Sequence, residues 1–239
     1  MIVIDIETSG LDLSKHGIWQ IGALDLNNPE NIFLEESRID DEDKIEQEAI
    51  KIHGKNEIYL RDRRRQSQEN LIKNLFSWTE KIDMKNTICQ NPQFDLGFII
   101  SKARRYGLGY PLGHRAFDLH SIAAMRYYQI YGKYSIRNQK NDAPPRLKSR
   151  GLLQALVFWM LGERTDALKG AVLVGPRHNK SDMGMTNILR LCGLEDRRRY
   201  HNALEDARLA AECFSRLVYG KSIIHEYSNI SIPEILQNA

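Results

Sequence analysis

The hydrophobic pattern begins as a β-strand. Ile2, Val3, Ile4 and Ile6 are β-branched, and such side chains favour the extended, pleated backbone of a strand. The run ends at the Thr-Ser-Gly sequence of residues 8–10, which is typical of a turn. The first eight residues therefore predict a strand that starts the fold.

The next apolar runs predict two more strands and a helix. Residues 19–24 and 31–34 are mainly apolar, and the turn-forming Asn-Asn-Pro sequence of residues 27–29 separates them. Together with the first strand they predict an antiparallel meander. Residues 66–82 then change to the helical period, and Ser67 is placed to cap that helix.

Short strands alternate with helices in the following segment. Residues 87–89 and 116–117 read as strands, whereas residues 95–106 and 119–131 have the apolar spacing of helices. Gly107 is placed as a C-cap. Strands that alternate with helices after an antiparallel start predict an α/β fold, with a mixed sheet and helices on both of its faces.

The alternation is interrupted before the last helix. Residues 132–150 contain few apolar side chains and a Pro-Pro pair, which predicts a loop, and residues 151–160 predict a helix. The whole stretch of about 132–183 is interpreted as an insertion. A final helix is predicted over residues 204–218, where alanine and large apolar residues form one stripe.

Composition excludes several classes of protein. The chain has 239 residues, of which 42% are hydrophobic and 27% charged, and no apolar run approaches the roughly 20 residues that span a bilayer. The N-terminus starts with strand-like sequence instead of a signal peptide. Cys89, Cys192 and Cys213 are widely spaced, which supports neither a disulfide framework nor a zinc site. We therefore expect a cytoplasmic protein without a membrane segment.

Charge is concentrated more than the net value of +3 indicates. Residues 126–150 contain seven basic side chains and one acid, Asp142, and four tyrosines are interleaved with them. Aromatic rings among cations suit single-stranded nucleic acid, because bases stack while phosphates are neutralised. A solvated insertion explains the same composition equally well. Arginines also cluster at residues 61–65 and 197–199.

Two acids stand within the first strand. Asp5 and Glu7 are two residues apart, so both project from one face, while Ile4 and Ile6 pack on the other. Buried carboxylates without a partner cost several kcal/mol, about 3–5 for an uncompensated charge. Either positive charge lies opposite them, or the strand is an edge strand whose outer face meets water.

Three further polar residues are informative only in combination. Asp95 begins a predicted helix, where capping alone explains an acid. His201 precedes Asp206 by five residues, and this spacing separates side chains by about 140° on a helix. The two share a site only if His201 lies in the loop before the helix and Asp206 lies in its first turns.

In this order, the segments DIETSG at residues 5–10, NPQFD at 91–95 and HNALEDA at 201–207 resemble the three motifs of the DEDDh family. That family comprises 3′-to-5′ exonucleases of the ribonuclease H-like fold, among them proofreading subunits of DNA polymerases, ribonuclease T and oligoribonuclease. Weaker matches lie at residues 19–22, 52–54 and 117–118.

The resemblance extends from residue 1 to about residue 219, and the long stretch 132–183 departs from it. We therefore expect an exonuclease domain over residues 1–222 that carries this basic insertion. Residues 223–239 form a C-terminal tail. The fold class implied is a ribonuclease H-like mixed sheet, with three antiparallel strands followed by parallel ones.

The resemblance also implies a site. Asp5, Glu7, Asp95 and Asp206 would hold two divalent ions, Mg²⁺ by preference with Mn²⁺ as a substitute, since carboxylate oxygens suit hard cations. His201 would act as general base. The terminal nucleotide would contact four residues: Thr8, Leu11, Ile52 and His53. Leu11 and Ile52 are equally well explained as core side chains, and His53 as a loop histidine.

The implied activity is metal-dependent hydrolysis from the 3′ end of single-stranded DNA, which releases 5′-mononucleotides, as in proofreading or DNA repair. Two alternatives stay open. One is an exoribonuclease of the same family that trims RNA 3′ ends, because both substrates present the same phosphodiester. The other is a nucleic-acid-binding module that has lost catalysis. The expected partner is a single-stranded 3′ end, and the sequence identifies no protein partner.

Overall fold

The computed structural model describes residues 1–137 and 180–237. The chain forms two compact units, one of residues 1–135 with 183–239 and the other of residues 136–182. The predicted sites all lie in the first unit. Within the described residues no helix is long and apolar enough to cross a membrane.

Only the ends of the second unit are described. Its strands β6 (Ile136–Arg137) and β7 (Lys180–Ser181) pair in antiparallel fashion. The helix predicted at residues 151–160 and most of the predicted insertion lie outside the described residues.

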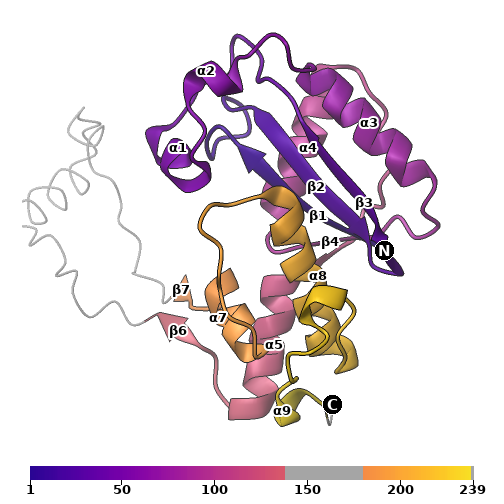
Figure 1. Ribbon diagram of the computed structural model, residues 1–239, viewed down its shortest axis with the longest axis vertical. Helices are drawn as coiled ribbons and strands as arrows, with labels where there is room; N and C mark the ends of the chain where they lie inside the picture. The colour runs from indigo at the N-terminus through magenta and orange to yellow at the C-terminus, as the bar shows by residue number, and fades with distance from the viewer. Residues whose placement is uncertain (138–179, 238–239) are drawn as a thin grey trace, which may run out of the picture. The chain divides into compact units, whose positions relative to one another are not determined.

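The first unit contains a five-stranded sheet in the order β3-β2-β1-β4-β5 (Figure 1). The strands β1, β2 and β3 are antiparallel, and β4 and β5 run parallel to β1. This arrangement confirms the predicted mixed sheet. The strand bounds are Ile2–Thr8 (β1), Ile18–Asp25 (β2), Asn28–Glu36 (β3), Thr87–Cys89 (β4) and Ala116–Asp118 (β5).

The third strand is longer than the sequence predicts. It begins at Asn28, which pairs with Asp25, so the predicted turn at residues 27–29 is wrong for its last two positions. Pro29 lies inside β3. A proline cannot donate a backbone hydrogen bond, but β3 is an edge strand, and one side of it needs no partner.

Helices cover both faces of the sheet, as predicted. One face packs against α3 (Gln68–Glu80) and α4 (Pro92–Arg105). The other packs against α5 (Leu119–Tyr131), α7 (Met185–Leu191) and α8 (Ala203–Tyr219). The shorter helices are α1 (Gln47–His53), α2 (Glu57–Leu60), the 3-10 helix His225–Tyr227 and α9 (Glu234–Gln237).

Local sequence explains where the predicted helices begin. The α3 helix starts after Ser67, whose hydroxyl accepts a hydrogen bond from the Asn70 N–H at 3.2 Å. The α4 helix starts three residues earlier than predicted, because Pro92 fits its first position and needs no backbone donor there. Asp95 therefore lies in the first turn of α4 instead of at its start.

The central strand β1 separates two core clusters. Ile4 and Ile6 pack with α3 and α4, whereas Val3 packs with α5 and α8. By alternation Asp5 and Glu7 lie on the Val3 face. The edge-strand explanation for these two acids is thus wrong, because β1 has a neighbour on each side.

The predicted tail is anchored to α8. Ile224 and Leu236 are buried in the same cluster as α8. The buried Arg216 guanidinium donates to backbone oxygens of Tyr227 and Ile230, and Glu212 accepts from the Ile224 N–H. Residues 223–237 thus cover one end of the helix that carries Asp206.

The start of α8 lies directly on β2, at a position where only glycine fits. Gly22 pairs with Asp5 across the sheet, and a Cβ atom at Gly22 would lie 2.2 Å from the Ala203 backbone. The Gln20 side chain accepts a hydrogen bond from the Ala203 N–H at 2.8 Å. These contacts set the height of α8 above the sheet.

We expect Gly22→Ala to lower the free energy of unfolding by about 1–3 kcal/mol, because overpacking forces α8 away from β2. Chemical denaturation measures this change. Gly109→Ala is the control, since a Cβ atom there meets nothing within 4 Å. Equal stability of the two variants would contradict the close approach of α8.

Candidate active site

Four carboxylates from three elements converge at the carboxyl end of β1. Asp5 and Glu7 belong to β1, Asp95 to the first turn of α4, and Asp206 to the first turn of α8. Because β1 and β4 are parallel, the chain that leaves β4 enters α4 at the same sheet edge where β1 ends. We call these four residues with His201 the acidic site.

His201 meets the condition set by its sequence spacing. It lies in the loop before α8, whose N-cap is Asn202, and its Nδ1 atom is 3.2 Å from Asp206 Oδ2. The side chain is 47% exposed, whereas that of Asp206 is 5% exposed. The neighbouring Asp206 carboxylate raises the pKa of His201 above its usual value.

The acidic site is short of positive charge. Burial, and then the Asp95 charge, raises the pKa of Asp5 well above its usual value. Burial also raises the pKa of Glu7 to about 7 and that of Asp95 to about 7. The site therefore holds protons near neutral pH when no cation compensates its charges.

Arg198 is a member of this site that the sequence analysis noted only as part of a basic cluster. Its Nη1 atom donates to Asp206 Oδ1 at 2.6 Å, and two of its nitrogens hold both oxygens of Asp196 at 2.8 and 2.7 Å. The guanidinium compensates one carboxylate oxygen. Arg198 lies three residues before the third motif, and this position was the only signal in the sequence. Sequence alone does not show where the side chain of a loop residue points.

The arrangement suits divalent cations. Single ligand atoms of Glu7, His201 and Asp206 lie within 4.8 Å of one another. The Asp206 Oδ2 atom is buried and, among the residues that the structure describes, receives no well-directed hydrogen bond. Carboxylate oxygens that are buried, crowded and incompletely paired fit Mg²⁺ or Mn²⁺, which take oxygen ligands.

A pocket of about 340 Å³ opens over the acidic site, and we call it the terminal pocket. Eight of the nine predicted site residues line it, and Asp206 adjoins it through His201. The eight are Asp5, Glu7, Thr8, Leu11, Ile52, His53, Asp95 and His201. The structure thus brings together all the residues that the resemblance selected.

The side chains proposed for the nucleotide differ in their exposure. Leu11 is 75% and Ile52 50% exposed, so neither is the core residue that sequence allowed. Thr8 is buried, and its hydroxyl donates to the Gly10 carbonyl at 2.8 Å. The Thr8 hydroxyl proton is therefore engaged within its own turn.

His53 is a buried neutral imidazole. Its Nδ1 atom accepts a hydrogen bond from the Lys55 N–H at 3.0 Å, so the ring proton lies on Nε2. Burial, and then the charges of Lys55 and His201, lowers the pKa of His53 to about 4. Its Nε2 atom finds no acceptor in residues 1–137 or 180–237.

The terminal pocket has further lining residues that the sequence analysis did not select, and two of them lie at the start of α1, a helix too short for a periodic signal. The terminal pocket includes Glu46 and Glu48, at the start of α1, and Phe94 from the second motif. Glu46 accepts a hydrogen bond from the Leu11 N–H at 3.3 Å. The loop after β1 and the start of α1 thus form one wall.

The raised pKa values predict how the stability of the metal-free protein depends on pH. Glu7 titrates at about 7 in the folded protein, against an ordinary value of 4.5. The folded state therefore binds more protons between these values, and the free energy of unfolding falls as the pH rises through that window. The fall due to Glu7 is about 3 kcal/mol.

Denaturant unfolding in a chelating buffer, at about pH 5 and about pH 8, measures this dependence. Glu7→Gln should remove the share of the difference that is due to Glu7, and saturating Mg²⁺ should remove the difference from the wild-type protein. A wild-type protein that becomes more stable relative to Glu7→Gln as the pH rises would contradict the raised pKa.

A mixed sheet with carboxylates gathered at the end of its central strand is the arrangement of the ribonuclease H-like fold. Residues 2–144 match the model of the family RNase_T, described as exonuclease. The match covers more than half of the chain, so the protein belongs to this exonuclease family. The resemblance to DEDDh exonucleases is confirmed.

Solved structures show the same fold at low sequence identity. The nuclease domain of 3′hExo, a DEDDh family member bound to rAMP, is 14% identical with a TM-score of 0.57, and the match covers 98% of this chain and 95% of that chain. A 3′-exonuclease that recognises the histone mRNA stem-loop is 13% identical (TM-score 0.56; 92% and 81% covered).

Escherichia coli exonuclease I in complex with a dT13 oligonucleotide is 12% identical with a TM-score of 0.54. The match covers 90% of this chain, which spans only 40% of that structure's chain. Among curated proteins, no sequence matches significantly.

Proposed function

We propose that the protein hydrolyses phosphodiester bonds from the 3′ end of single-stranded DNA and releases 5′-mononucleotides. The observation that carries this proposal is the convergence of Asp5, Glu7, Asp95 and Asp206 beside one pocket, with raised pKa values for the first three. Such a cluster is stable near neutral pH only with cations or protons. Membership in the exonuclease family supports the same reaction.

The four carboxylates would hold two divalent ions, Mg²⁺ or Mn²⁺. When bound, the ions supply activation of the attacking water and charge stabilisation for the leaving oxygen. His201 would take the proton of that water, since its imidazole lies at the rim of the pocket and remains 47% exposed. Asp206 would orient the ring through its contact with Nδ1.

The terminal pocket would receive the last nucleotide of the strand. Leu11 and Ile52 present exposed apolar side chains there, and such surfaces suit the face of a base. Thr8 would lie by the sugar, with the turn that its hydroxyl supports. His53 would offer its Nε2 proton to the substrate.

RNA trimming is the second candidate, and the structural neighbours give it specific support. The 3′hExo domain is bound to rAMP and the related exonuclease recognises an mRNA stem-loop, and this chain spans more of them than of exonuclease I with its dT13 oligonucleotide. The acidic site does not discriminate, because the two substrates share their phosphodiester.

Matched single-stranded DNA and RNA oligomers with a 5′ label test the proposal. With Mg²⁺ we expect DNA to shorten stepwise from its 3′ end, and a chelator should stop the reaction. If RNA shortens faster than DNA, the proposed activity on DNA is wrong and the protein is an exoribonuclease. Binding of both oligomers without cleavage of either would support the inactive module and contradict the proposal.

We propose that the protein is cytoplasmic, as expected from its sequence. All three cysteines, Cys89, Cys192 and Cys213, are free and buried, as in a reducing compartment.

A further inference from the structure

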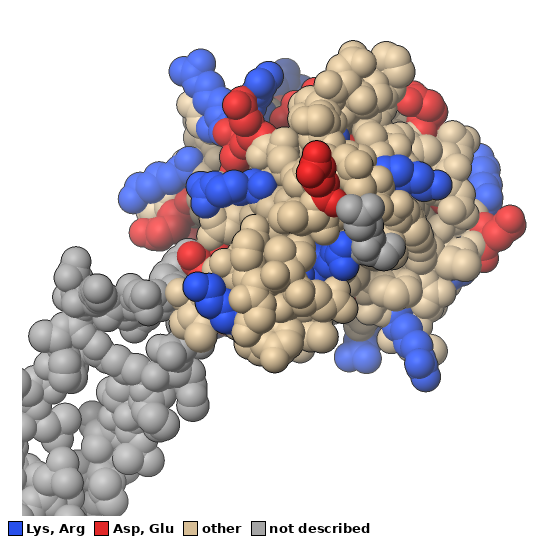
Figure 2. Space-filling view, turned by 90° about the horizontal axis from the view of Figure 1, so that it is seen from below, with Lys and Arg blue, Asp and Glu red and all other residues tan. Residues whose placement is uncertain are grey.

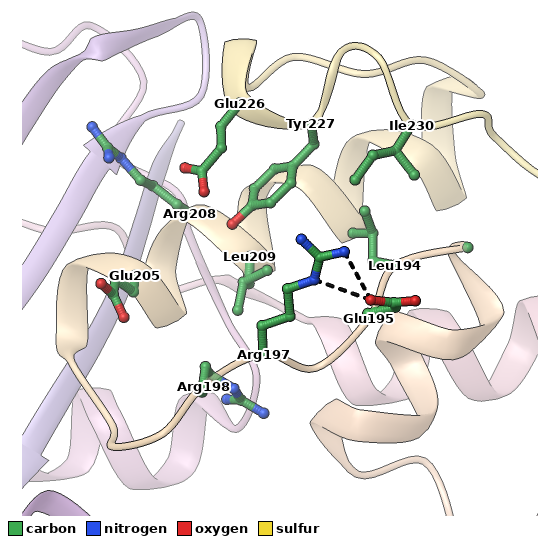
Figure 3. A pocket seen from close by; sticks show the side chains of 11 residues that line it. Leu194, Glu195, Arg197, Arg198, Glu205, Arg208, Leu209, Glu226, Tyr227 and Ile230 are labelled. Atoms are coloured by element: carbon green, nitrogen blue, oxygen red, sulfur yellow. Dashed lines mark hydrogen bonds and ion pairs between the residues drawn. The ribbon is translucent and has the colours of Figure 1, made fainter.

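Two surfaces outside the terminal pocket carry charges of both signs. On the face drawn in Figure 2, basic and acidic side chains are interspersed. A pocket of about 490 Å³ beside Arg198 is lined by three arginines and three glutamates, and Arg197 is paired there with Glu195 at 2.8 Å (Figure 3). A polyanion gains little from such a balance.

A larger pocket continues directly from the terminal pocket. It has a volume of about 640 Å³, and we call it the basic pocket. His53 and His201 line both pockets and so form the boundary between them. The basic pocket is therefore adjacent to the site proposed for the last nucleotide of a strand.

Two cations of the basic pocket are free to bind phosphate. Lys55 and Arg199 line it and form no ion pair within the described parts of the chain. Its acid Glu36 is already paired with Arg65 at 2.6 Å. Glu205 is the one acid of the pocket without such a partner among the described residues, so the free cations exceed the free acids.

Aromatic rings lie beside both of these cations. Lys55 Nζ lies 4.4 Å from the centroid of the Tyr59 ring and 5.9 Å from that of Trp19. Tyr200 is 54% exposed, and its ring lies so close to Gly54 that a Cβ atom there would meet it at 3.2 Å. The ring is thus supported from the α1 side, and the Cζ atom of Arg199 lies 5.9 Å from its centroid.

We propose that the basic pocket binds the single-stranded nucleic acid just upstream of the terminal nucleotide, with Lys55 and Arg199 on its phosphates and Tyr200 stacked on a base. This inference rests on the proposed exonuclease function and names further binding residues for it. Cationic grooves with exposed aromatic rings bind single strands in this way, independently of sequence. The buried Nε2 proton of His53, which has no acceptor among the described residues, lies at the boundary between the two pockets.

Two substrates distinguish the contribution of the basic pocket from that of the terminal pocket. The p-nitrophenyl ester of thymidine 5′-monophosphate has a terminal nucleotide but no upstream strand, whereas a single-stranded oligothymidylate fills both pockets. In Lys55→Ala/Arg199→Ala and in Tyr200→Ala, we expect the ratio of kcat/KM for the oligomer to kcat/KM for the ester to fall about tenfold.

Salt dependence gives a second readout that a merely structural role would not change. Each lost phosphate contact lowers the slope of log affinity against log salt by about 0.7 for a single strand, so the double variant should lose about 1.4. Lys81→Ala is the control, because Lys81 is exposed and lines neither pocket. It should change neither the ratio nor the slope.

An unchanged ratio and an unchanged slope in the double variant would overturn the inference. Equal losses on the ester and the oligomer would also overturn it, since they would place Lys55 and Arg199 at the terminal pocket. If the wild-type protein cleaves neither substrate with Mg²⁺ or Mn²⁺, the proposed function itself fails. That result is distinct from both of the others.

Discussion

We expect the replacement of Asp5 by Asn to lower the proposed exonuclease activity by about a hundredfold or more, because a carboxylate of the central strand is lost from the charged centre of the reaction. The same change should raise the melting temperature of the metal-free protein. Asp5 has a raised pKa from burial and from Asp95, so its removal relieves repulsion that folding otherwise has to overcome.

Thermal unfolding and single-turnover hydrolysis measure the two effects on one preparation. In a chelating buffer near neutral pH we expect Asp5→Asn to melt on the order of 5 °C above the wild type. Added Mg²⁺ should stabilise the wild type and leave the variant unchanged. Asp25→Asn is the matched control, since Asp25 pairs with the N-terminal amine at the other end of the sheet. Full activity of Asp5→Asn would remove Asp5 from the site.

We expect the replacement of His201 by Gln to lower the rate of the proposed hydrolysis by about 10²–10⁴, the usual loss when a general base is removed. Metal-dependent stabilisation should persist in this variant, because the four carboxylates are retained. His201 is half exposed and contacts Asp206 from the rim of the pocket, so the change leaves the packing of α8 intact.

The comparison of rate with metal binding separates two roles for His201. An imidazole that only removes a proton can be lost without a change in the midpoint of Mn²⁺ titration. The close grouping of His201 with Glu7 and Asp206 would also suit a ligand. If His201→Gln raises that midpoint as much as Glu7→Gln does, His201 is a ligand and the general-base assignment is wrong.

The sequence predicted the sheet and the position of its acids because both follow from local periodicity. Alternation in β1 fixes Asp5 and Glu7 on one face, and the short apolar runs of β4 and β5 are bounded by turns and helices. Three motifs in family order then selected Asp95, His201 and Asp206. Asp95 reaches the site because β4 runs parallel to β1, whereas His201 and Asp206 reach it because α8 packs on β2 at Gly22. The sequence alone displays neither arrangement.

Other parts depend on tertiary contacts and left no clear signal. The α1 helix has seven residues, too few for the helical period to show. The direction of Arg198 is set by Asp196 and Asp206, and the glycine at position 22 is required by the backbone of α8. Each of these depends on a residue distant in sequence or on a loop conformation.

The anomalous signal of a crystal soaked in manganese tests directly whether divalent cations lie between the four carboxylates. We expect two manganese ions among the carboxylate oxygens of Asp5, Glu7, Asp95 and Asp206, and their loss in Asp5→Asn crystals. A soaked wild-type crystal with no manganese between these oxygens would contradict this expectation.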